Sequence, residues 1–275
     1  MKTIYKTFLA SIIGIFAVSN LNAQTRIKTE KMNQLNQVNE LEIVNQLSSQ
    51  PAVVNMPVSQ LLNAPGNEAL RDFFFKPVKD KTILKGKRIA VIAADGFEEI
   101  ELLGPVWYFK QLGAQVDIVA PKFNPAPARY GLVYPEMSKT HIMAIQYLQP
   151  VGWIKFDKTA DQIKVNDYHA VFIPGGAWNP DNLRYDKDVI KFLQDFNKSG
   201  KLIAAICHAP VVLASADILK GRKLTGYWNI QVDLKNAGAT VVDEPVVTDG
   251  NIVTSRHPID VADFSRAVEN WLVKK

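Results

Sequence analysis

A single cysteine stands where an apolar run gives way to a helical pattern. In LIAAICHAPVVLASA, residues 202–216, a strand-like stretch leads to Cys207 and His208. A nucleophile on a tight strand-to-helix turn needs small residues two positions before it and two after it, because larger side chains collide as the chain reverses. Ala205 and Ala209 meet that requirement. The spacing therefore predicts a nucleophile elbow.

The helix that follows Cys207 bears on the acidity of its thiol. A helix N-terminus presents free N–H groups and the positive end of a dipole, so we expect it to lower the thiol pKa. The alternative is a buried structural cysteine, which is the commoner fate of an unpaired thiol. The residues around Cys207 leave both interpretations open.

The base that would serve the thiol is also open. His208 follows Cys207 directly, but neighbouring residues at a helix start point in different directions. Either the imidazole adopts an unusual rotamer or another strand supplies the base. Glu101 offers that alternative, since two leucines follow it and an inward carboxyl would have a raised pKa. Glu98 and Glu99 are interpreted as solvated partners of a helix dipole.

A glycine pair supplies a third element of chemistry. Gly175 and Gly176 end the apolar run of FIPGG and let the backbone approach a bound carbonyl closely. Their N–H groups could form an oxyanion site with the N–H of His208. A glycine pair after a strand is also common in plain turns, so this signal is weak by itself.

The other histidines lack the spacing of metal ligands. A metal site needs two or more converging donors, and His141, His169 and His257 are far apart in the sequence. We expect them at the surface or in packing, and we expect neither a metal nor a cofactor.

Alternating strands and helices must position these residues. Apolar runs alternate with helical patterns from residue 87 onward, at 87–96, 114–121, 168–176 and 201–207. Strands buried on both faces indicate an α/β fold, doubly wound, with a mainly parallel sheet and helices on both faces. Functional groups gather at the carboxyl ends of such strands, where Glu101, the glycine pair and Cys207 fall.

Six stretches in consistent order resemble the ThiJ/PfpI family, of the class I glutamine amidotransferase-like superfamily with a flavodoxin-like fold. They are ADGFEEIELLGP, VFIPGGAWNPDNLR, IAAICHAP, LKGRKLTGY, NAGA and VVTDGNIVTSRHP. The likeness runs from about Lys87 to Trp271. The ICHAP elbow with the upstream glutamate and PGG is the most specific part.

The resemblance implies roles for individual residues. It makes Cys207 the nucleophile, Glu101 the acid that contacts its sulfur, and His208 the histidine of the PfpI-like branch. In that branch the carboxylate partner of the histidine comes from an adjoining subunit, and Asp181 matches it. A homodimer or larger homo-oligomer would then complete the site.

Binding roles follow from the same likeness. Gly175 and Gly176 fit the oxyanion site with the backbone of His208, and Tyr227 matches a pocket side chain. Family activities include peptidase, glyoxalase-type conversion of methylglyoxal, deglycation and stress protection. We therefore expect a cysteine-dependent hydrolase or glyoxalase-type enzyme that takes small carbonyl or peptide-like substrates. The alternative is a redox-sensing or chaperone-like protein in which the same cysteine is oxidised.

The first residues have the order of a secretory signal peptide. Two lysines precede an apolar run at 8–18, and a polar stretch ends in Ala23. Such a run is too short for a hydrocarbon layer, which needs about 20 residues. We expect cleavage after Ala23 and an exported protein, periplasmic or secreted, with no membrane span.

The remaining organisation is simple. Residues 1–23 are predicted as the signal peptide, 24–80 as an N-terminal extension and linker, and 81–275 as the ThiJ/PfpI-like domain. Removal of the signal peptide takes two lysines from a net charge of +5 and leaves +3. No basic run or stripe is present, so we expect no nucleic-acid partner.

One segment departs from the family pattern. Residues 122–167 are long for a bare connection, and the resemblance does not explain them. We expect a lid, an oligomer contact or a pocket wall. The aromatic residues that would build such a wall are Tyr130, Tyr134, Tyr147 and Trp153.

Overall fold

The computed structural model describes residues 56–275 except 126, 128 and 130. The compact unit that contains them spans Asn55–Lys275. The predicted signal peptide and most of the predicted extension lie outside the described residues. Among the described residues, no helix is long and apolar enough to cross a membrane.

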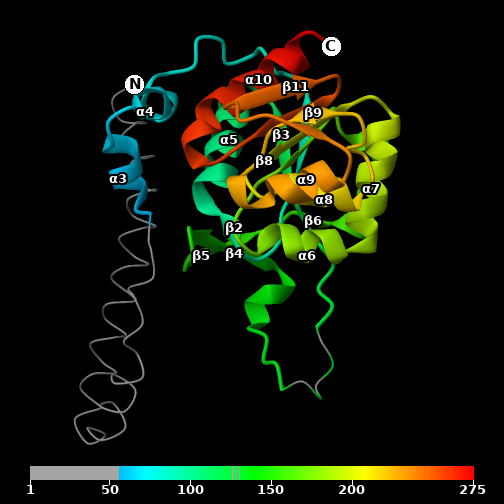
Figure 1. Cartoon of the computed structure of the whole chain (residues 1–275). Helices are drawn as coiled ribbons and strands as arrows, with labels where there is room; N and C mark the ends of the chain where they lie inside the picture. Colours follow the sequence, from blue (N-terminus) through cyan, green and yellow to red (C-terminus); the bar gives the residue numbers. More distant parts are fainter. Residues whose placement is uncertain (1–55, 126, 128, 130) are drawn as a thin grey trace, which may run out of the picture. The chain divides into compact units, whose positions relative to one another are not determined.

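A seven-stranded sheet forms the centre of this unit (Figure 1). Its strand order is β11-β12-β8-β7-β1-β3-β6, and every neighbouring pair is parallel except β11 with β12. The bounds are β1 Arg88–Ile92, β3 Gln115–Ala120, β6 Lys158–Thr159, β7 Ala170–Ile173, β8 Leu202–Ile206, β11 Val246–Asp249 and β12 Ile252–Ser255. The predicted mainly parallel, doubly wound fold is confirmed.

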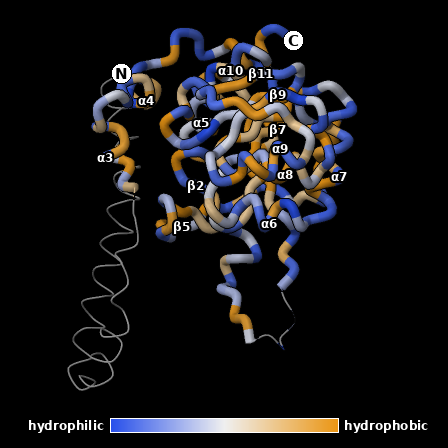
Figure 2. The backbone as a smooth tube through the Cα atoms, viewed as in Figure 1, coloured by the Kyte–Doolittle hydropathy of each residue, from blue (hydrophilic) through white to orange (hydrophobic). Residues whose placement is uncertain are grey.

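Helices cover the two faces of this sheet and bury a separate core on each. One core receives Phe109 and Phe264, from α5 and α10, and the other receives Phe192 and Leu234, from α7 and α9. Figure 2 shows the apolar residues concentrated inside the unit. The helices are α3 Val58–Asn63, α4 Glu68–Phe75, α5 Glu99–Gln111, α6 Asn179–Tyr185, α7 Lys187–Lys198, α8 Pro210–Ser215, α9 Gln231–Asn236 and α10 Val261–Val273.

Helices α3 and α4 fall within the predicted extension, yet their apolar side chains join the first core. Leu70 is 1% exposed and Phe73 is 4% exposed. The Phe73 ring lies 4.8 Å from that of Tyr108 on α5. The apolar residues of this stretch therefore stabilise the α/β unit rather than only link it to what precedes.

The long segment that the family pattern did not explain contains a β-hairpin. Strands β4 (His141–Gln146) and β5 (Gln149–Lys155) are antiparallel, and β4 pairs with the short β2 (Phe97–Glu98). Because β2 immediately follows the β1 loop, this second sheet is attached beside the carboxyl end of β1. A third, two-stranded sheet joins β9 (Lys223–Leu224) and β10 (Thr240–Val241).

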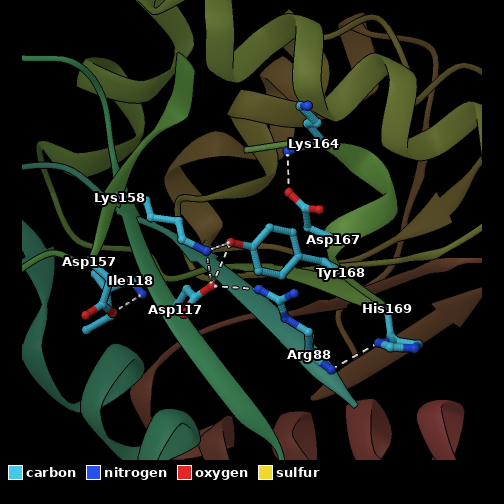
Figure 3. A network of polar contacts seen from close by, with 9 residues as sticks. All are labelled: Arg88, Asp117, Ile118, Asp157, Lys158, Lys164, Asp167, Tyr168 and His169. Carbon is cyan, nitrogen blue, oxygen red and sulfur yellow. Dashed lines mark hydrogen bonds and ion pairs between the residues drawn. The ribbon is translucent and has the colours of Figure 1, made fainter. Parts of the chain in front are cut away.

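A polar network fixes the edge strand β6 to the central sheet (Figure 3). The Asp117 carboxylate accepts hydrogen bonds from Lys158 Nζ at 2.7 Å and from the Tyr168 hydroxyl at 2.8 Å, and Arg88 lies 3.5 Å away. These charges lower the pKa of Asp117 against the effect of its own partial burial. Arg88 opens β1, so the network lies toward the end of the sheet opposite the glycine pair and Cys207.

Candidate active site

Cys207 lies at the turn between β8 and α8 with a backbone φ of +62°. A left-handed conformation is strained for a residue with a side chain, and it persists only where the surroundings enforce it. The Cys207 N–H donates to the Ser255 carbonyl at 3.0 Å, and the Cys207 carbonyl accepts from the Tyr227 N–H at 2.9 Å. Ala205 and Ala209 are fully buried beside the turn. This geometry matches the predicted elbow.

Glu101 on α5 reaches the same point from the first strand. Its side chain is fully buried, and Oε2 accepts a hydrogen bond from the Gly175 N–H at 2.9 Å. Its carboxyl group is also close enough to the Cys207 thiol for each group to shift the pKa of the other. Its Oε1 has no nitrogen or oxygen partner among the described residues. The structure thus brings Glu101 and Cys207 together, as the sequence predicts.

The two acids do not titrate as the sequence suggests. Burial raises the pKa of Glu101 well above its ordinary value, and the nearby Glu98 raises it further. Burial also raises the pKa of the Cys207 thiol, with Glu101 adding to the effect and the Gly176 N–H opposing it. The expected lowering by the short helix α8 is therefore wrong, because desolvation outweighs the dipole. A neutral Glu101 remains available as a hydrogen-bond donor to sulfur.

The interpretation of Glu98 and Glu99 as solvated side chains is wrong. Glu98 is 4% exposed and Glu99 is 7% exposed, because the β4–β5 hairpin covers them. Glu98 Oε2 accepts the Tyr147 N–H at 2.8 Å, and Glu99 Oε2 accepts from Gln146 Nε2 at 2.9 Å. Burial raises the pKa of Glu98 to about 8. Glu98 is thus a site residue that the sequence reasoning missed.

The glycine pair is required by close packing. A Cβ at Gly175 would lie 2.4 Å from Cys207 Cβ and 2.6 Å from Glu101 Oε2. Gly176 has a φ of +102°, and a Cβ there would lie 2.2 Å from the Gly96 carbonyl oxygen. The Gly175 N–H donates to Glu101 Oε2, and the Gly176 N–H favours the Cys207 thiolate and so lowers the thiol pKa.

These bonds change the expected oxyanion site. The N–H of Gly175 already has an acceptor, so it is not available to a substrate oxygen. The His208 N–H has no acceptor among the described residues. It lies at the opening of α8 beside the sulfur. His208 therefore supplies an available donor, and the Gly176 N–H, which favours the thiolate, supplies a second.

The imidazole of His208 reaches the sulfur, which resolves the question left open by their adjacency. The distance from Cys207 Sγ to His208 Nδ1 is 3.2 Å. Burial lowers the pKa of His208, while Asp181 opposes that shift. The ring is therefore predominantly neutral near pH 7 and able to accept a proton.

Asp181 lies near His208 within the same chain. Both line a cavity of about 150 Å³ together with Arg184 and Asp233. The Asp181 side chain is 76% exposed, and its carboxylate lies 3.6 Å from Arg184. In the described chain no hydrogen bond joins Asp181 to His208. Asp181 thus acts on its own His208 only through charge.

Aromatic rings continue outward from His208. The Tyr227 ring stacks on the imidazole with centroids 4.3 Å apart. The ring centroids of Tyr227 and Trp228 are 5.1 Å apart, and those of Trp228 and His257 are also 5.1 Å apart. His257 is 9% exposed and has a packing role, as expected. Within the described residues, no group of three or more His, Cys, Asp or Glu could hold a metal ion.

One of the aromatic residues proposed as a pocket wall reaches this site. Burial raises the pKa of Tyr227 to about 12, and the nearby Tyr147 side chain adds to the rise. Tyr134 instead packs edge-on against Phe123 at 5.6 Å. Tyr130 lies outside the described residues.

Sequence comparison matches this elbow and its surroundings to a known family. The DJ-1/PfpI family matches residues 87–270. The chain belongs to the DJ-1/PfpI family. This assignment agrees with the resemblance drawn from ADGFEEIE, PGG and ICHAP.

Characterised and uncharacterised DJ-1/PfpI proteins are similar to this chain over most of their length. General stress protein 18 of Bacillus subtilis is 37% identical over 182 residues, which are 66% of this chain and 95% of that protein. The putative cysteine protease YraA of the same organism is 38% identical, and the match covers 68% of this chain and 98% of that protein. Protein/nucleic acid deglycase 2 of Escherichia coli is 36% identical, and the match covers 66% of this chain and 94% of that protein.

Solved DJ-1/PfpI structures share the fold. Drosophila melanogaster DJ-1beta has a TM-score of 0.58 at 27% identity and covers 69% of this chain and 91% of its own. A protein from Anabaena variabilis with a DJ-1/ThiJ/PfpI-like domain and a ferritin-like domain has a TM-score of 0.58 at 32% identity. The match covers 68% of this chain but 48% of that two-domain protein.

Proposed function

We propose that this DJ-1/PfpI protein is an exported cysteine-dependent enzyme that acts on small carbonyl or peptide-like substrates. One observation carries the proposal. The Cys207 sulfur lies 3.2 Å from a predominantly neutral imidazole and beside a carboxyl group whose pKa is raised by burial. A base and a hydrogen-bond donor thus converge on one nucleophile.

The geometry supports thiol addition to a carbonyl. In the tautomer that carries its proton on Nε2, His208 Nδ1 accepts the Cys207 thiol proton. The sulfur lone pair forms a bond to the carbonyl carbon, and the carbonyl π pair moves to oxygen. The His208 N–H then donates to that oxygen, which counters its developing charge. Protonated Glu101 stabilises the thiolate before addition.

The second half of the reaction depends on the substrate. With an aldehyde, protonation of the oxygen by the His208 imidazolium gives a hemithioacetal. With an amide, the same imidazolium protonates the departing nitrogen, and water then hydrolyses the thioester. The names of the similar deglycase and the similar putative cysteine protease fit these two outcomes. Both begin with the same addition.

The proposal also includes export of the protein, a role in stress protection and assembly into an oligomer. The signal-like residues 1–23 support export, and similarity to general stress protein 18 supports a role in stress protection. The mature protein is then expected to begin at Gln24, which N-terminal sequencing tests.

Asp181, exposed and unbonded to its own His208, supports a homodimer or larger homo-oligomer in which it serves a neighbouring site. Sedimentation of the native chain tests the assembly.

The substitution Cys207→Ser tests the function directly. A serine hydroxyl is a much weaker acid than a thiol and lacks the nucleophilic thiolate. We expect turnover of methylglyoxal, or of a fluorogenic peptide, to fall to background. Rates equal to those of the native chain would remove Cys207 from the mechanism.

Mild peroxide separates the enzyme from the redox-sensing alternative. An exposed thiolate reaches sulfenic or sulfinic acid readily, whereas Cys207 is 5% exposed and its thiol pKa is raised. We expect mass spectrometry to find Cys207 reduced while the exposed Met137 is oxidised. Oxidation of Cys207 before Met137, with no turnover of either substrate, would favour the redox sensor.

A further inference from the structure

Asn179, the first residue of α6, places a polar side chain in the interior of the unit. It is fully buried, although asparagine is mostly exposed in folded proteins. A buried amide is costly unless it is hydrogen-bonded. Its Oδ1 accepts the Ala94 N–H at 2.6 Å, and its Nδ2 donates to the carbonyls of Pro174 at 2.6 Å and Gly175 at 3.2 Å. The carboxamide therefore joins segments that lie 85 residues apart in the chain.

The two joined segments are loops at the same end of the central sheet. Ala94 follows β1, and Pro174 and Gly175 follow β7. These strands are parallel neighbours in the sheet, so their carboxyl ends lie side by side. Backbone bonds support the junction, since the Asn179 N–H donates to the Gly96 carbonyl at 3.3 Å. Asn179 thus fixes the loop after β7 against the loop after β1.

The Gly175 backbone connects this junction to the acid and the thiol. Its N–H donates to Glu101 Oε2 at 2.9 Å. A Cβ on Gly175 would lie 2.6 Å from that oxygen and 2.4 Å from Cys207 Cβ. The carboxyl group and the cysteine therefore both pack directly against one glycine. A shift of Gly175 would change how the acid lies relative to the thiol.

We propose that Asn179 is a positioning residue that fixes the Gly175 backbone, and through its N–H the Glu101 carboxyl group, beside the Cys207 thiol. The inference rests on the proposed function, since it concerns the acid that stabilises the thiolate there. An asparagine side chain carries an acceptor and two donor hydrogens in one plane. One residue can therefore accept from the loop after β1 and donate to the loop after β7.

A double-mutant cycle on thiol alkylation tests the inference. The variants are Asn179→Leu, Glu101→Leu and both together, and the readout is the rate of Cys207 alkylation by iodoacetamide at a fixed pH. Leucine frees the Gly175 loop, so we expect the rate of Asn179→Leu to fall about fivefold, as for the loss of one ordinary hydrogen bond. In the Glu101→Leu background the same change should alter the rate less than about twofold, because the group through which Asn179 acts is absent.

Asn251 supplies the matched control. Its side chain likewise bridges separate segments, since it accepts from Arg222 Nη2 at 3.1 Å and donates to the Lys201 carbonyl at 3.0 Å. It precedes β12 and lies beside the start of β8, whereas Cys207 follows the end of β8. We expect Asn251→Leu to lower the free energy of unfolding, measured by urea titration, and to leave the alkylation rate unchanged.

Two results would overturn the inference. One is a native alkylation rate in folded Asn179→Leu. The other is a double variant whose loss equals the product of the two single losses, since Asn179 would then act independently of Glu101. If Asn179→Leu does not fold, Asn179→Asp takes its place in the cycle, because it keeps the acceptor for the Ala94 N–H and loses the amide group that donates to the loop carbonyls.

The alkylation assay also separates this inference from the proposed function. Alkylation needs no substrate, so native protein without turnover would refute the proposed function while the cycle could still hold. Where turnover exists, Asn179→Leu should lower kcat more than it raises KM, because Glu101 acts on the thiolate rather than on substrate binding.

Discussion

At the scale of single residues, the site depends on groups kept neutral by burial. Glu101 is fully buried, its pKa is raised, and it contacts a thiol whose pKa is also raised. Both groups therefore keep their protons to a higher pH than the same groups in water. The useful state of Glu101 is then the protonated one, which donates a hydrogen bond to sulfur.

Substitution of Glu101 by glutamine and by leucine distinguishes this role from that of a carboxylate base. Glutamine keeps an acceptor for the Gly175 N–H and a donor for the sulfur, so we expect the alkylation rate of Cys207 to change less than about threefold. Leucine removes the donor, and a hydrogen bond to a charged group contributes roughly 1.5–3 kcal/mol, so we expect a loss of tenfold or more. A Glu101→Gln variant as slow as Glu101→Leu would argue for an ionised Glu101.

Glu98 makes stability depend on pH. Burial raises its pKa from 4.5 to about 8, so the native state retains a proton that the unfolded chain releases. The contribution of this group to stability is fully present below pH 4.5 and is lost as the pH rises through 8. We expect Glu98→Gln to remove this loss, worth up to about 5 kcal/mol, and to flatten the fall in Tm between pH 5 and pH 9.

Glu244→Gln serves as the control for that comparison. Glu244 carries the same charge on a side chain that is 56% exposed. It should leave the pH dependence of Tm as in the native chain. If Glu98→Gln and Glu244→Gln gave the same curve, Glu98 would be ionised in the native state at neutral pH.

At the scale of elements, the loop after β7 and the turn after β8 must approach each other without side chains between them. Gly175 and Gly176 allow Glu101, the elbow and the β2 backbone to meet. The positive φ of Gly176 adds a conformational reason to the steric one. The site is therefore built by the contact of three strand ends rather than by any one of them.

Alanine at Gly176 tests that contact. Its Cβ would lie 2.2 Å from the Gly96 carbonyl oxygen and 2.5 Å from the Glu98 nitrogen, and backbone atoms cannot move aside as a flexible side chain can. We expect Gly176→Ala to lower the free energy of unfolding by at least about 2 kcal/mol and to abolish turnover, as measured by urea titration and assay.

Gly152→Ala is the matched control, since nothing lies within 4 Å of its Cβ position on β5. We expect it to keep native activity and stability. A tolerated Gly176→Ala would mean that the loop after β7 can shift without harm to the site.

At the scale of the whole molecule, the stretch before the α/β pattern contributes to its core. Phe73 lies in α4 between Phe74 and Tyr108, at centroid distances of 5.1 and 4.8 Å. Two positions later, Phe75 is 47% exposed. Phe73 and Phe75 are the same residue type in the same helix but differ in burial, so a comparison of the two isolates the effect of burial on stability.

Truncation of these two side chains measures the contribution of α4. Phe73→Ala should lower the free energy of unfolding by about 3 kcal/mol, as is typical for a phenylalanine removed from a core. Phe75→Ala should change it by less than about 1 kcal/mol. Urea denaturation of both variants supplies the comparison. Equal losses would place α4 outside the core in solution.

Much of the fold could be predicted from local pattern, because parallel strands buried on both faces form apolar runs. The elbow could be predicted because small residues must flank the nucleophile. The burial of Glu98 and Glu99 could not, since the hairpin that covers them lies more than forty residues later in the chain. The contact of His208 with sulfur depends on the φ of Cys207, which adjacency in sequence does not specify.

The burial of the Cys207 sulfur limits which molecules can form a covalent bond with it. Glu101, Gly176 and His208 enclose Cys207 and leave it 5% exposed. Two proteins join through a disulfide only when their sulfurs approach to about 2 Å, which an enclosed sulfur prevents for another folded chain. The lone cysteine therefore stays out of covalent cross-links even in an oxidising medium.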